Sequence, residues 1–429
     1  MYQSSLTVNF GNLLLSLSDA LELSNPLLMQ HQMRTAYVAW EIAKRAGLSA
    51  EEIETLFLAA LFHDIGALTP EEKVLIHSFE ETDADRHCRK GKLLFELVPW
   101  LAPAAPLVRY HHHEWQEWSA DDPAKLVRGS QILLLADQLE RRIDRSRYIL
   151  FQNEGILADI QGLAGRVADP ELVDCLRQAA DREEFWLDLT SPRLYSLLLN
   201  FGPYQRRELS IDDLSEIANV FSFIIDFRSR FTATHSAGVA ECAKRLAELF
   251  GLTSTEVKMM EIAGQLHDLG KLSIPNAILE KPSGLTREEF AIIKRHTYYT
   301  YSILNTIGGL GPIPEWGALH HEKLDGNGYP FRLPARDIGS GSRIMQVADL
   351  FTAMAESRPY RKTGMPKDQI VRVFCDRVNA GTLDRRITGL VLNNYDVIRE
   401  QVLTRQEEVR TIYDSQFADA RTESELMCA

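Results

Sequence analysis

Residues 235–268 read HSAGVAECAKRLAELFGLTSTEVKMMEIAGQLHD, and residues 31–64 read HQMRTAYVAWEIAKRAGLSAEEIETLFLAALFHD. Each stretch starts at a histidine and ends, with the same spacing, in an adjacent His-Asp pair. The constant offset of 204 residues (235 minus 31) also matches small residues: Ala36 with Ala240, Ala43 with Ala247, Gly47 with Gly251 and Ala59 with Ala263. A long internal repeat decides the organisation of a chain. The sequence therefore predicts two copies of one domain.

Histidines beyond these two stretches repeat as well. His87 and His111 are 24 residues apart in the first copy, and His296 and His320 are 24 residues apart in the second. Ten of the twelve histidines occupy matched positions. A lone histidine on a helix is usually an ordinary polar residue. Two matched sets of five, each with a His-Asp pair and a later aspartate, instead indicate metal ligands.

The spacing of apolar residues is helical, so we predict an all-α protein. The stripe within residues 239–250 predicts a helix that ends at Gly251. A second stripe, residues 259–266, predicts a helix that carries the His-Asp pair and ends at Gly270. A third stripe covers residues 344–351. Alternation typical of strands is scarce.

We expect two tandem helical domains of the same type. The first is predicted over residues 1–205 and the second over residues 206–429, with a helical C-terminal extension. Turn residues near positions 202–211 mark the boundary. Ser210 with Asp213 has the pattern of a helix start for the second domain.

The composition limits the class of protein. The chain has 429 residues, of which 45% are hydrophobic and 25% charged, and its net charge is −13. These values exclude disordered and fibrous classes, and an acidic chain without a basic tract is not expected to bind polymeric nucleic acid. No apolar run reaches the roughly 18 residues of a membrane helix, and no basic residue precedes Arg34, unlike in a signal peptide. The five scattered cysteines fit a reducing compartment, so we expect a cytoplasmic protein.

The second copy carries seven residues of the kinds that bind metals. They are His235, His267, Asp268, His296, His320, His321 and Asp349. Seven ligands exceed the needs of one four- to six-coordinate ion, whereas two ions that share a carboxylate fit the number. Adjacent helical residues point about 100° apart, so Asp268 could bridge while His267 binds one ion. Imidazole and carboxylate ligands without thiolate favour Fe, Mn or Zn over Mg or Ca.

Three motifs of the second copy resemble the HD-GYP family, a branch of the HD phosphohydrolase superfamily. They are HDLGK at 267–271, HHEKLDGNGYP at 320–330 and SRIMQVADLFTAMAESRPYRK at 342–362. The second motif matches the family's HHExxDGxGYP signature in full, and the resemblance covers about residues 211–365. The first copy, about residues 25–190, resembles a degenerate HD domain of the same origin.

The resemblance implies a non-haem centre of two divalent ions. The ions are expected to be Fe or Mn, with Zn or Ni as alternatives. Some relatives add a third ion through a Glu four residues before the first histidine, but Phe231 stands at that position here. The resemblance divides the ligands into the bridging Asp268, then His235, His267 and Asp349 for one ion, and His296, His320 and His321 for the other.

The resemblance also implies contacts with a phosphate substrate. Lys271 of the HDLGK motif would contact the scissile phosphate and stabilise charge on it. Arg358 and Arg361 lie where family members hold substrate phosphates, and arginine can make bidentate contacts with them. Tyr329 of the GYP motif would lie near the ligand or at a partner surface. The family links this loop both to substrate access and to contacts with GGDEF diguanylate cyclase domains.

The activity implied by the resemblance is hydrolysis of a bacterial cyclic dinucleotide, cyclic di-GMP or 3',3'-cyclic GMP-AMP, to the linear dinucleotide. A metal-activated hydroxide would attack the phosphodiester, so no Ser or Cys nucleophile is required. Three alternatives stay open: a non-hydrolytic module that binds cyclic dinucleotide or a GGDEF partner, hydrolysis of other nucleotides, and oxidative di-iron chemistry. The sequence does not fix the oligomeric state, and a homodimer is one expectation.

The first copy keeps a full candidate ligand set but departs elsewhere. Ala67 stands where the second copy has Lys271, and HHHEWQEWSADDPA replaces the GYP signature. The alignment of HHE is ambiguous, because the pair could be the first two or the last two of three histidines. Either a metal-loaded, non-hydrolytic domain or a relic whose histidines make ordinary hydrogen bonds fits, and neither is expected to be the main catalyst. The candidate set is His31, His63, Asp64, His87, His111, His112 and Asp137, with His112-His113 as the alternative pair.

Overall fold

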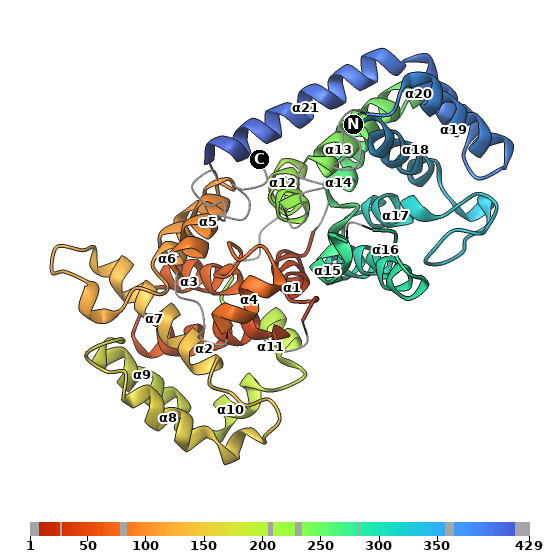
Figure 1. Ribbon diagram of the computed structural model, residues 1–429. Helices are drawn as coiled ribbons and strands as arrows, with labels where there is room; N and C mark the ends of the chain where they lie inside the picture. The colour runs from red at the N-terminus through yellow and green to blue at the C-terminus, as the bar shows by residue number, and fades with distance from the viewer. Residues whose placement is uncertain are drawn as a thin grey trace. The chain divides into compact units, whose positions relative to one another are not determined.

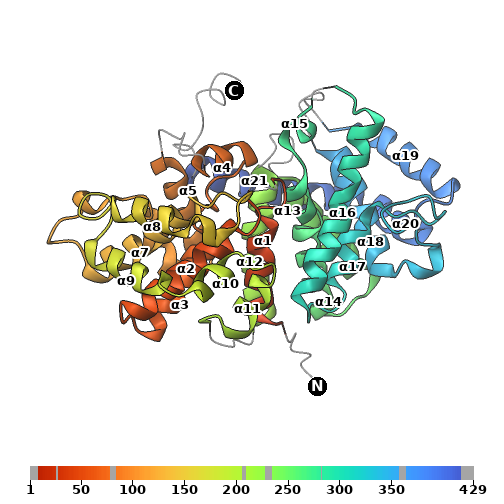
Figure 2. The ribbon, with the colours of Figure 1, turned by 90° about the horizontal axis from the view of Figure 1, so that it is seen from below.

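A computed structural model describes residues 8–25, 28–77, 84–204, 209–227, 234–281, 283–356 and 364–416. The chain forms two compact units: the first unit is Asn9–Arg207, and the second unit is formed mainly by Glu208–Ala429. Within the described ranges the regular elements are helices and no strand forms (Figure 1, Figure 2). The all-α prediction is confirmed. In the same ranges no helix is both long enough and apolar enough to cross a membrane.

The first unit is built around α2 and α3, which follow a short N-terminal helix. Its elements are α1 (Phe10–Ala20), α2 (His31–Arg45), α3 (Ala50–Phe62), α4 (Pro70–His77), α5 (Ala84–Glu96), η2 (Ala102–Ala104), α6 (Ala105–Arg109), η3 (Trp115–Glu117), α7 (Ala124–Glu140), η4 (Ile149–Phe151), α8 (Asn153–Gln161), α9 (Pro170–Ala180), α10 (Glu183–Leu189) and α11 (Leu194–Phe201).

The second unit is built around α13 and α14 and ends in a long helix. Its elements are α12 (Ile211–Phe227), α13 (His235–Phe250), α14 (Ser254–Leu266), η5 (Leu269–Ser273), α15 (Asn276–Leu279), α16 (Arg287–Ile307), α17 (Ile313–Ala318), η6 (Leu319–His321), η7 (Ala335–Asp337), α18 (Ser340–Ala355), α19 (Lys367–Asn379), α20 (Arg385–Asn393) and α21 (Tyr395–Gln416).

The two units repeat one arrangement of helices. In the first unit α2 packs against α3 and α7, and in the second unit α13 packs against α14 and α18. Both α3 and α14 start with a capping box, formed by Ser49 with Glu52 and by Thr253 with Glu256. The reciprocal hydrogen bonds of a capping box satisfy free N–H groups of the first turn. The offset between the two boxes (253 minus 49) is the 204 residues of the sequence repeat.

A buried carboxyl group supports the first turn of α2 and of α13. Glu22 accepts a hydrogen bond of 2.8 Å from the backbone N–H of Gln32. Asp226 accepts hydrogen bonds from the backbone N–H and the hydroxyl of Ser236, at 3.0 and 2.7 Å. Burial raises the pKa of Glu22 to about 8 and that of Asp226 to about 7. These pairs, again 204 residues apart, hold the helices that begin with the first predicted ligand.

Two helix boundaries agree with the sequence prediction. α13 ends at Phe250, and Gly251 follows with φ of 95°, a conformation that favours glycine. α12 begins at Ile211, where the hydroxyl of Ser210 and the carboxylate of Asp213 exchange hydrogen bonds with each other's backbone N–H.

The predicted end of α14 at Gly270 is wrong. The helix stops at Leu266, so His267 and Asp268 follow it and the angle between two helical residues does not describe them. Gly270 lies instead in η5, where an added Cβ would be 1.8 Å from the carbonyl oxygen of His296. Glycine is needed here because two backbone segments touch, and not because a helix ends.

Candidate metal centre

The seven predicted ligands of the second unit converge from five segments. Five of the seven side chains are buried, and the other two are partly exposed. Their positions are His235 at the start of α13, His267 and Asp268 after α14, His296 on α16, His320 and His321 in η6, and Asp349 on α18.

Backbone carbonyl groups fix the orientation of three imidazoles. His267, His296 and His320 each donate from Nδ1 to the carbonyl oxygen three residues earlier, at 2.8, 2.7 and 2.7 Å. A neutral imidazole that carries its proton on Nδ1 presents a lone pair on Nε2. Metal-binding histidines are oriented by this kind of hydrogen bond.

Acceptor atoms face one another at one end of the cluster. Nε2 of His235 lies 3.2 Å from Oδ1 of Asp349. Nε2 of His267 lies 3.1 Å from Oδ2 of Asp268 and 4.0 Å from Oδ1 of Asp349, yet it makes no hydrogen bond within the described residues. The enclosed Nε2 of His267 beside two carboxylates therefore favours a positive charge at this end.

The same end of the cluster favours positive charge. Nδ1 of His235 lies 3.1 Å from Oε1 of Glu356. Burial by itself lowers the pKa of His235, but Glu356 and Asp349 outweigh burial and raise that pKa to about 10. A cation, whether a proton or a metal ion, is therefore strongly stabilised at this point.

Two further imidazole nitrogens meet at the other end. Nε2 of His296 lies 3.3 Å from Nε2 of His320, and the two atoms are 3.5 and 4.0 Å from Oδ1 of Asp268. The ring of His321 stands beside that of His296, with centroids 5.2 Å apart. Asp268 thus directs Oδ2 towards one end and Oδ1 towards the other, which is the geometry of a carboxylate that can bridge two cations.

The protonation states of His296, His320 and Asp268 suit metal ligands. Burial lowers the pKa of His296 to about 3 and lowers the pKa of His320 as well, so both rings are neutral near pH 7. Burial by itself raises the pKa of Asp268, but His267 and Lys271 outweigh burial and hold that pKa well below its usual range. Neutral imidazole and ionised carboxylate are the forms that bind a metal.

Lys271 lies at the edge of this cluster. It belongs to η5, its Nζ is 2.5 Å from Oδ2 of Asp268, and its side chain is 24% exposed. The ammonium group therefore reaches both the carboxylate at the middle of the cluster and the solvent. Arg358 and Arg361, the other cations expected near a substrate, lie outside the described residues, as does Phe231.

A single carboxylate closes the loop that carries the GYP motif. Oε1 of Glu322 accepts hydrogen bonds from the N–H groups of Phe331 and Arg332 at 2.7 and 3.0 Å, and Oε2 accepts one from Leu333 at 3.1 Å. Glu322 is buried, and an added Cβ on Gly328 would be 2.4 Å from the Cα atom of Glu322. The loop therefore folds back tightly onto its own first residue.

Aromatic rings border the centre next to this loop. The ring of Tyr329 lies 4.9 Å from that of His321, measured between centroids. Phe331 packs against Tyr301 and Tyr298 with centroids 5.2 and 6.4 Å apart. Tyr298 and Phe331 are 51% and 38% exposed. The structure thus places Tyr329 against a predicted ligand and leaves two aromatic rings open to solvent nearby.

The first unit brings its predicted ligands together in the same way. Nδ1 of His111 donates to the carbonyl oxygen three residues earlier at 2.6 Å. Its Nε2 lies 3.2 Å from Nε2 of His87 and 3.7 Å from Oδ1 of Asp64. His111 therefore stands where the second unit has the first histidine of HHE, so the structure favours the pair His111-His112 over His112-His113.

The other end of the first cluster repeats as well. Nε2 of His31 and Nε2 of His63 are 3.3 Å apart. Oδ1 of Asp137 lies 3.4 and 3.7 Å from these two atoms, and Oδ2 of Asp64 lies 3.6 and 3.5 Å from them. Nδ1 of His31 pairs with Glu140 at 2.5 Å. Each unit can therefore surround two cations with a shared aspartate between them.

Comparison with known proteins places both clusters in one family. Two family profiles described as HD domain match the chain, over residues 28–142 and over residues 219–386. The 3'3'-cGAMP-specific phosphodiesterase 1 of Vibrio cholerae is 30% identical over 378 residues, which cover 85% of this chain and 87% of that protein. The chain belongs to the HD-GYP family of phosphodiesterases.

Other members of the family cover the chain to different extents. The 3'3'-cGAMP-specific phosphodiesterase 3 of Vibrio cholerae is 26% identical over 86% of this chain and 91% of its own. A cyclic di-GMP phosphodiesterase of Thermotoga maritima is 39% identical over 35% of this chain and 41% of its own. The crystal structure of the V. cholerae cyclic GMP-AMP-specific phosphodiesterase V-cGAP3 shares the fold, with a TM-score of 0.62 at 22% identity over 92% of this chain and 98% of that one.

The first unit departs from an HD-GYP centre in its cations. Ala67, in place of Lys271, is 2% exposed. The cation nearest a predicted ligand is instead Arg141, whose Nη1 lies 3.1 Å from Oδ2 of Asp137. Arg141 also donates to the backbone at the end of α4 through a 3.4 Å hydrogen bond to the carbonyl oxygen of His77. Here the cation supports a ligand and α4, whereas the second unit keeps Lys271 partly open to solvent.

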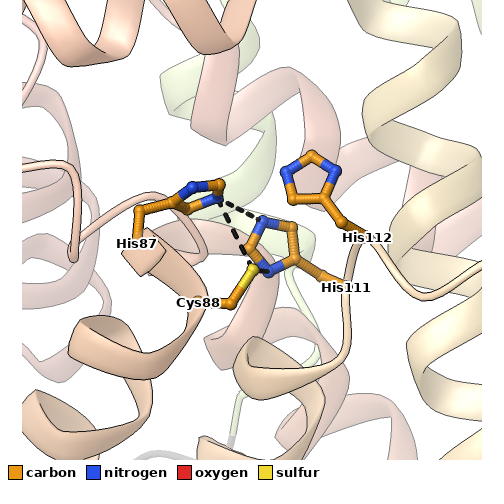
Figure 3. Close-up of side chains that lie close together, drawn as sticks. All are labelled: His87, Cys88, His111 and His112. Carbon is orange, nitrogen blue, oxygen red and sulfur yellow. Dashed lines mark hydrogen bonds between the residues drawn. The ribbon is translucent and has the colours of Figure 1, made fainter. Parts of the chain in front are cut away.

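A thiol also enters the first cluster. Cys88 follows His87 on α5, and its Sγ lies 3.7 Å from Nε2 of His87 and 3.6 Å from Nδ1 of His111 (Figure 3). Burial by itself raises the pKa of the Cys88 thiol, but His111 and His87 outweigh burial and lower that pKa to about 6. The HD-GYP centre of the second unit has Thr297 at this position.

Sequence reasoning missed Glu140, Glu356 and Cys88. Glu140 and Glu356 each pair with the first histidine of their set. Glu140 lies three residues after Asp137 on α7 and shares a helix face with it, whereas Glu356 lies seven residues after Asp349 and follows the end of α18. The spacing of Glu140 was a usable signal. Because the two spacings differ, comparison of the two copies did not reveal it.

Proposed function

We propose that this protein hydrolyses one phosphodiester bond of a bacterial cyclic dinucleotide and releases the linear dinucleotide. The reaction would take place in the domain of residues 206–429, while the domain of residues 1–205 would not be the main catalyst. The observation that carries the proposal is the carboxylate of Asp268, which faces two groups of imidazoles and Lys271. Relatives that match most of this chain are named as phosphodiesterases.

The proposed cofactor is a pair of divalent ions in the second unit. Imidazole and carboxylate ligands favour Fe or Mn, with Zn or Ni as alternatives. When bound, such ions neutralise the anionic phosphate and make hydroxide available near neutral pH. Phe231 in place of a glutamate supports two ions rather than three. The proposed ligands are His235, His267, Asp268, His296, His320, His321 and Asp349.

The side chains of the protein would have separate tasks. Asp268 would be a ligand of both cations. Lys271 would donate to a phosphate oxygen and stabilise the charge that grows there in the transition state. Arg358 and Arg361 would hold substrate phosphates. Tyr329 would border the entrance from which the substrate approaches.

Two cyclic dinucleotides are candidate substrates. The relatives that match over most of their own length are named for cyclic GMP-AMP, which supports 3',3'-cyclic GMP-AMP. Relatives that match over shorter stretches include proteins named for cyclic di-GMP. The exposed rings of Tyr298 and Phe331 support a nucleotide of either kind, because bases stack on aromatic side chains.

Metal analysis combined with a turnover assay tests this proposal. The full chain is supplied with 3',3'-cyclic GMP-AMP, cyclic di-GMP and cyclic di-AMP, with and without oxygen, and the products are separated. We expect bound divalent metal and a linear dinucleotide in both atmospheres. Binding without any product would support the non-hydrolytic module instead, and an oxygen-dependent product would support oxidative chemistry.

Location and partners complete the proposal. A cytoplasmic location agrees with the free thiols of Cys88, Cys175, Cys242 and Cys375 among the described residues. GGDEF domains as partners of the GYP loop, and a homodimer, are predictions. Titration with a purified GGDEF domain and light scattering of the full chain would test them.

A further inference from the structure

We propose that the first unit holds a metal ion in a closed site with a thiolate ligand, formed by His87, Cys88, His111 and His112. Thiolate and imidazole ligands in a set of four favour tetrahedral Zn²⁺. The site would therefore differ in its ion from the Fe or Mn centre proposed for the second unit. This inference goes beyond the hydrolytic function and does not depend on it.

The four side chains lie close enough together to hold one ion. One ligand atom of each residue lies within 4.8 Å of those of the other three. Sγ of Cys88 is 3.7 Å from Nε2 of His87, which is 3.2 Å from Nε2 of His111. Zn–N and Zn–S bonds of about 2.0 and 2.3 Å give tetrahedron edges of roughly 3.3 to 3.8 Å. Figure 3 shows the four side chains close together, with the thiol beside the ring of His111.

Two enclosed atoms at this site have no hydrogen bond within the described residues. Nδ1 of His111 already donates to the carbonyl oxygen of Val108, so its Nε2 presents a lone pair to His87. Nε2 of His112 and Oδ1 of Asp64 are enclosed and make no hydrogen bond within the described part of the chain. A relic whose histidines had become ordinary polar residues would satisfy them with protein donors. A cation supplies what these lone pairs lack.

The second unit shows what the same position does without a thiol. Thr297 follows His296 as Cys88 follows His87, and its hydroxyl donates to the carbonyl oxygen of Lys294 at 3.0 Å. Thr297 therefore bonds to its own helix. Among the described residues, the groups of the second unit that could hold a metal contain no cysteine.

A thiolate ligand would also explain why the first unit lacks substrate-binding features. Four protein ligands complete a tetrahedral zinc site and leave no open position for water or substrate. On binding, Zn²⁺ replaces the thiol proton, which leaves to solvent. A site of this kind needs neither a lysine at position 67 nor a GYP loop. Its contribution would be to the stability of the first unit.

Cobalt spectroscopy of the full chain tests the site. Thiolate bound to Co²⁺ absorbs strongly in the near ultraviolet through charge transfer, a readout that is independent of turnover. We expect this band in the wild type and in Cys175→Ser, and its loss in Cys88→Ser and Cys88→Thr. Cys175 is the matched control because it is buried in the same unit outside the cluster, and Cys88→Thr copies the second unit.

Zinc affinity and X-ray absorption give independent readouts. Competition with a chelator measures the zinc affinity of the first unit. Cys88→Thr should lower this affinity by more than roughly 10–100-fold, which is the loss expected for a residue that only hydrogen-bonds to a metal ligand. Zinc-edge absorption of the wild type should show sulfur scattering even if both variants misfold. The proposal is overturned if wild type fills with Co²⁺ without a thiolate band, if the band persists in folded Cys88→Ser, or if zinc-edge spectra show no sulfur.

Discussion

Nζ of Lys271 lies 2.5 Å from Oδ2 of Asp268. The pair joins a partly exposed cation to the carboxylate that faces both groups of imidazoles. Lys271 donates and does not ligate, so its loss should affect the chemistry of the centre more than its assembly. In the first unit the matched position is the buried Ala67, and the cation beside a predicted ligand is Arg141, which pairs with Asp137.

Lys271→Ala is expected to lower turnover by ~10²–10³-fold while metal content stays unchanged, the usual cost of losing one group that stabilises transition-state charge. Turnover is measured together with elemental analysis of the purified protein. Lys281→Ala is a matched control, because Lys281 is a similarly exposed lysine of the same unit that pairs with Glu289. Loss of metal in Lys271→Ala would show a structural role instead.

His267→Ala combined with Asp268→Ala should abolish turnover and remove at least one ion. Both ends of the cluster lose an acceptor, because Asp268 faces each of them. The matched control is His63→Ala with Asp64→Ala, which should leave most of the turnover, because the first unit is not proposed as the main catalyst. Full activity in a metal-free form of the His267→Ala, Asp268→Ala variant would show that the proposed centre is not the catalytic one.

A fragment of about residues 1–205 should fold without hydrolysing cyclic dinucleotides, and a fragment of about residues 206–429 should keep the chemistry. Ala67→Lys alone should not create activity in the first fragment. Position 67 is 2% exposed, so a lysine there would be buried and could not face solvent as Lys271 does. Circular dichroism checks folding and the turnover assay checks activity. Turnover by the first fragment at the rate of the full chain would contradict the assignment.

Glu22→Gln should change how stability depends on pH. Burial raises the pKa of Glu22 from its ordinary 4.5 to about 8, so between these values the folded protein keeps a proton that the unfolded chain has released. Stability from this group is therefore present at low pH and lost as pH rises through that window. Glutamine can still accept the hydrogen bond from the backbone N–H of Gln32 and does not titrate. The free energy of unfolding of the variant should therefore exceed that of the wild type most clearly above pH 8.

Urea denaturation at pH 4.5, 6.5 and 8.5 measures this effect as the free energy of unfolding. Glu51→Gln, at an exposed position of α3, is the control for removal of one surface charge. An equal pH slope for wild type and Glu22→Gln would show that Glu22 does not titrate within this range.

Tyr298→Ala should raise KM and leave kcat and metal content nearly unchanged. Stacking of a base on an aromatic ring contributes about 1–3 kcal/mol, which corresponds to an increase in KM of roughly 5- to 160-fold. Tyr148→Ala is the control, because Tyr148 is a 54% exposed tyrosine of the first unit. An unchanged KM would exclude Tyr298 from substrate binding.

Much of the fold was predictable because histidines, aspartates and small residues recur with the same spacing in both copies. The histidine and aspartate positions and the helices follow from short-range patterns that both copies share, and the helix start at Ser210 follows from its spacing to Asp213. The end of α14 was not predictable, because Gly270 looks like a helix stop and is required by contact with a helix far along the chain. Cys88 gave no signal, since its role depends on His111, which lies 23 residues away.

Gly270 and its counterpart Gly66 set the same backbone-to-backbone distance in the two duplicated centres. An added Cβ would be 1.8 Å from the carbonyl oxygen of His296 at Gly270, and 2.0 Å from that of His87 at Gly66. Main-chain atoms thus set how far the segment with the bridging aspartate stands from the opposite helix, whatever side chains fill the space between. A copy that lacks the lysine or carries a thiol keeps the same close approach of these two backbone segments. After duplication, the bound ion can therefore differ between the two units while the backbone spacing around the centre stays the same.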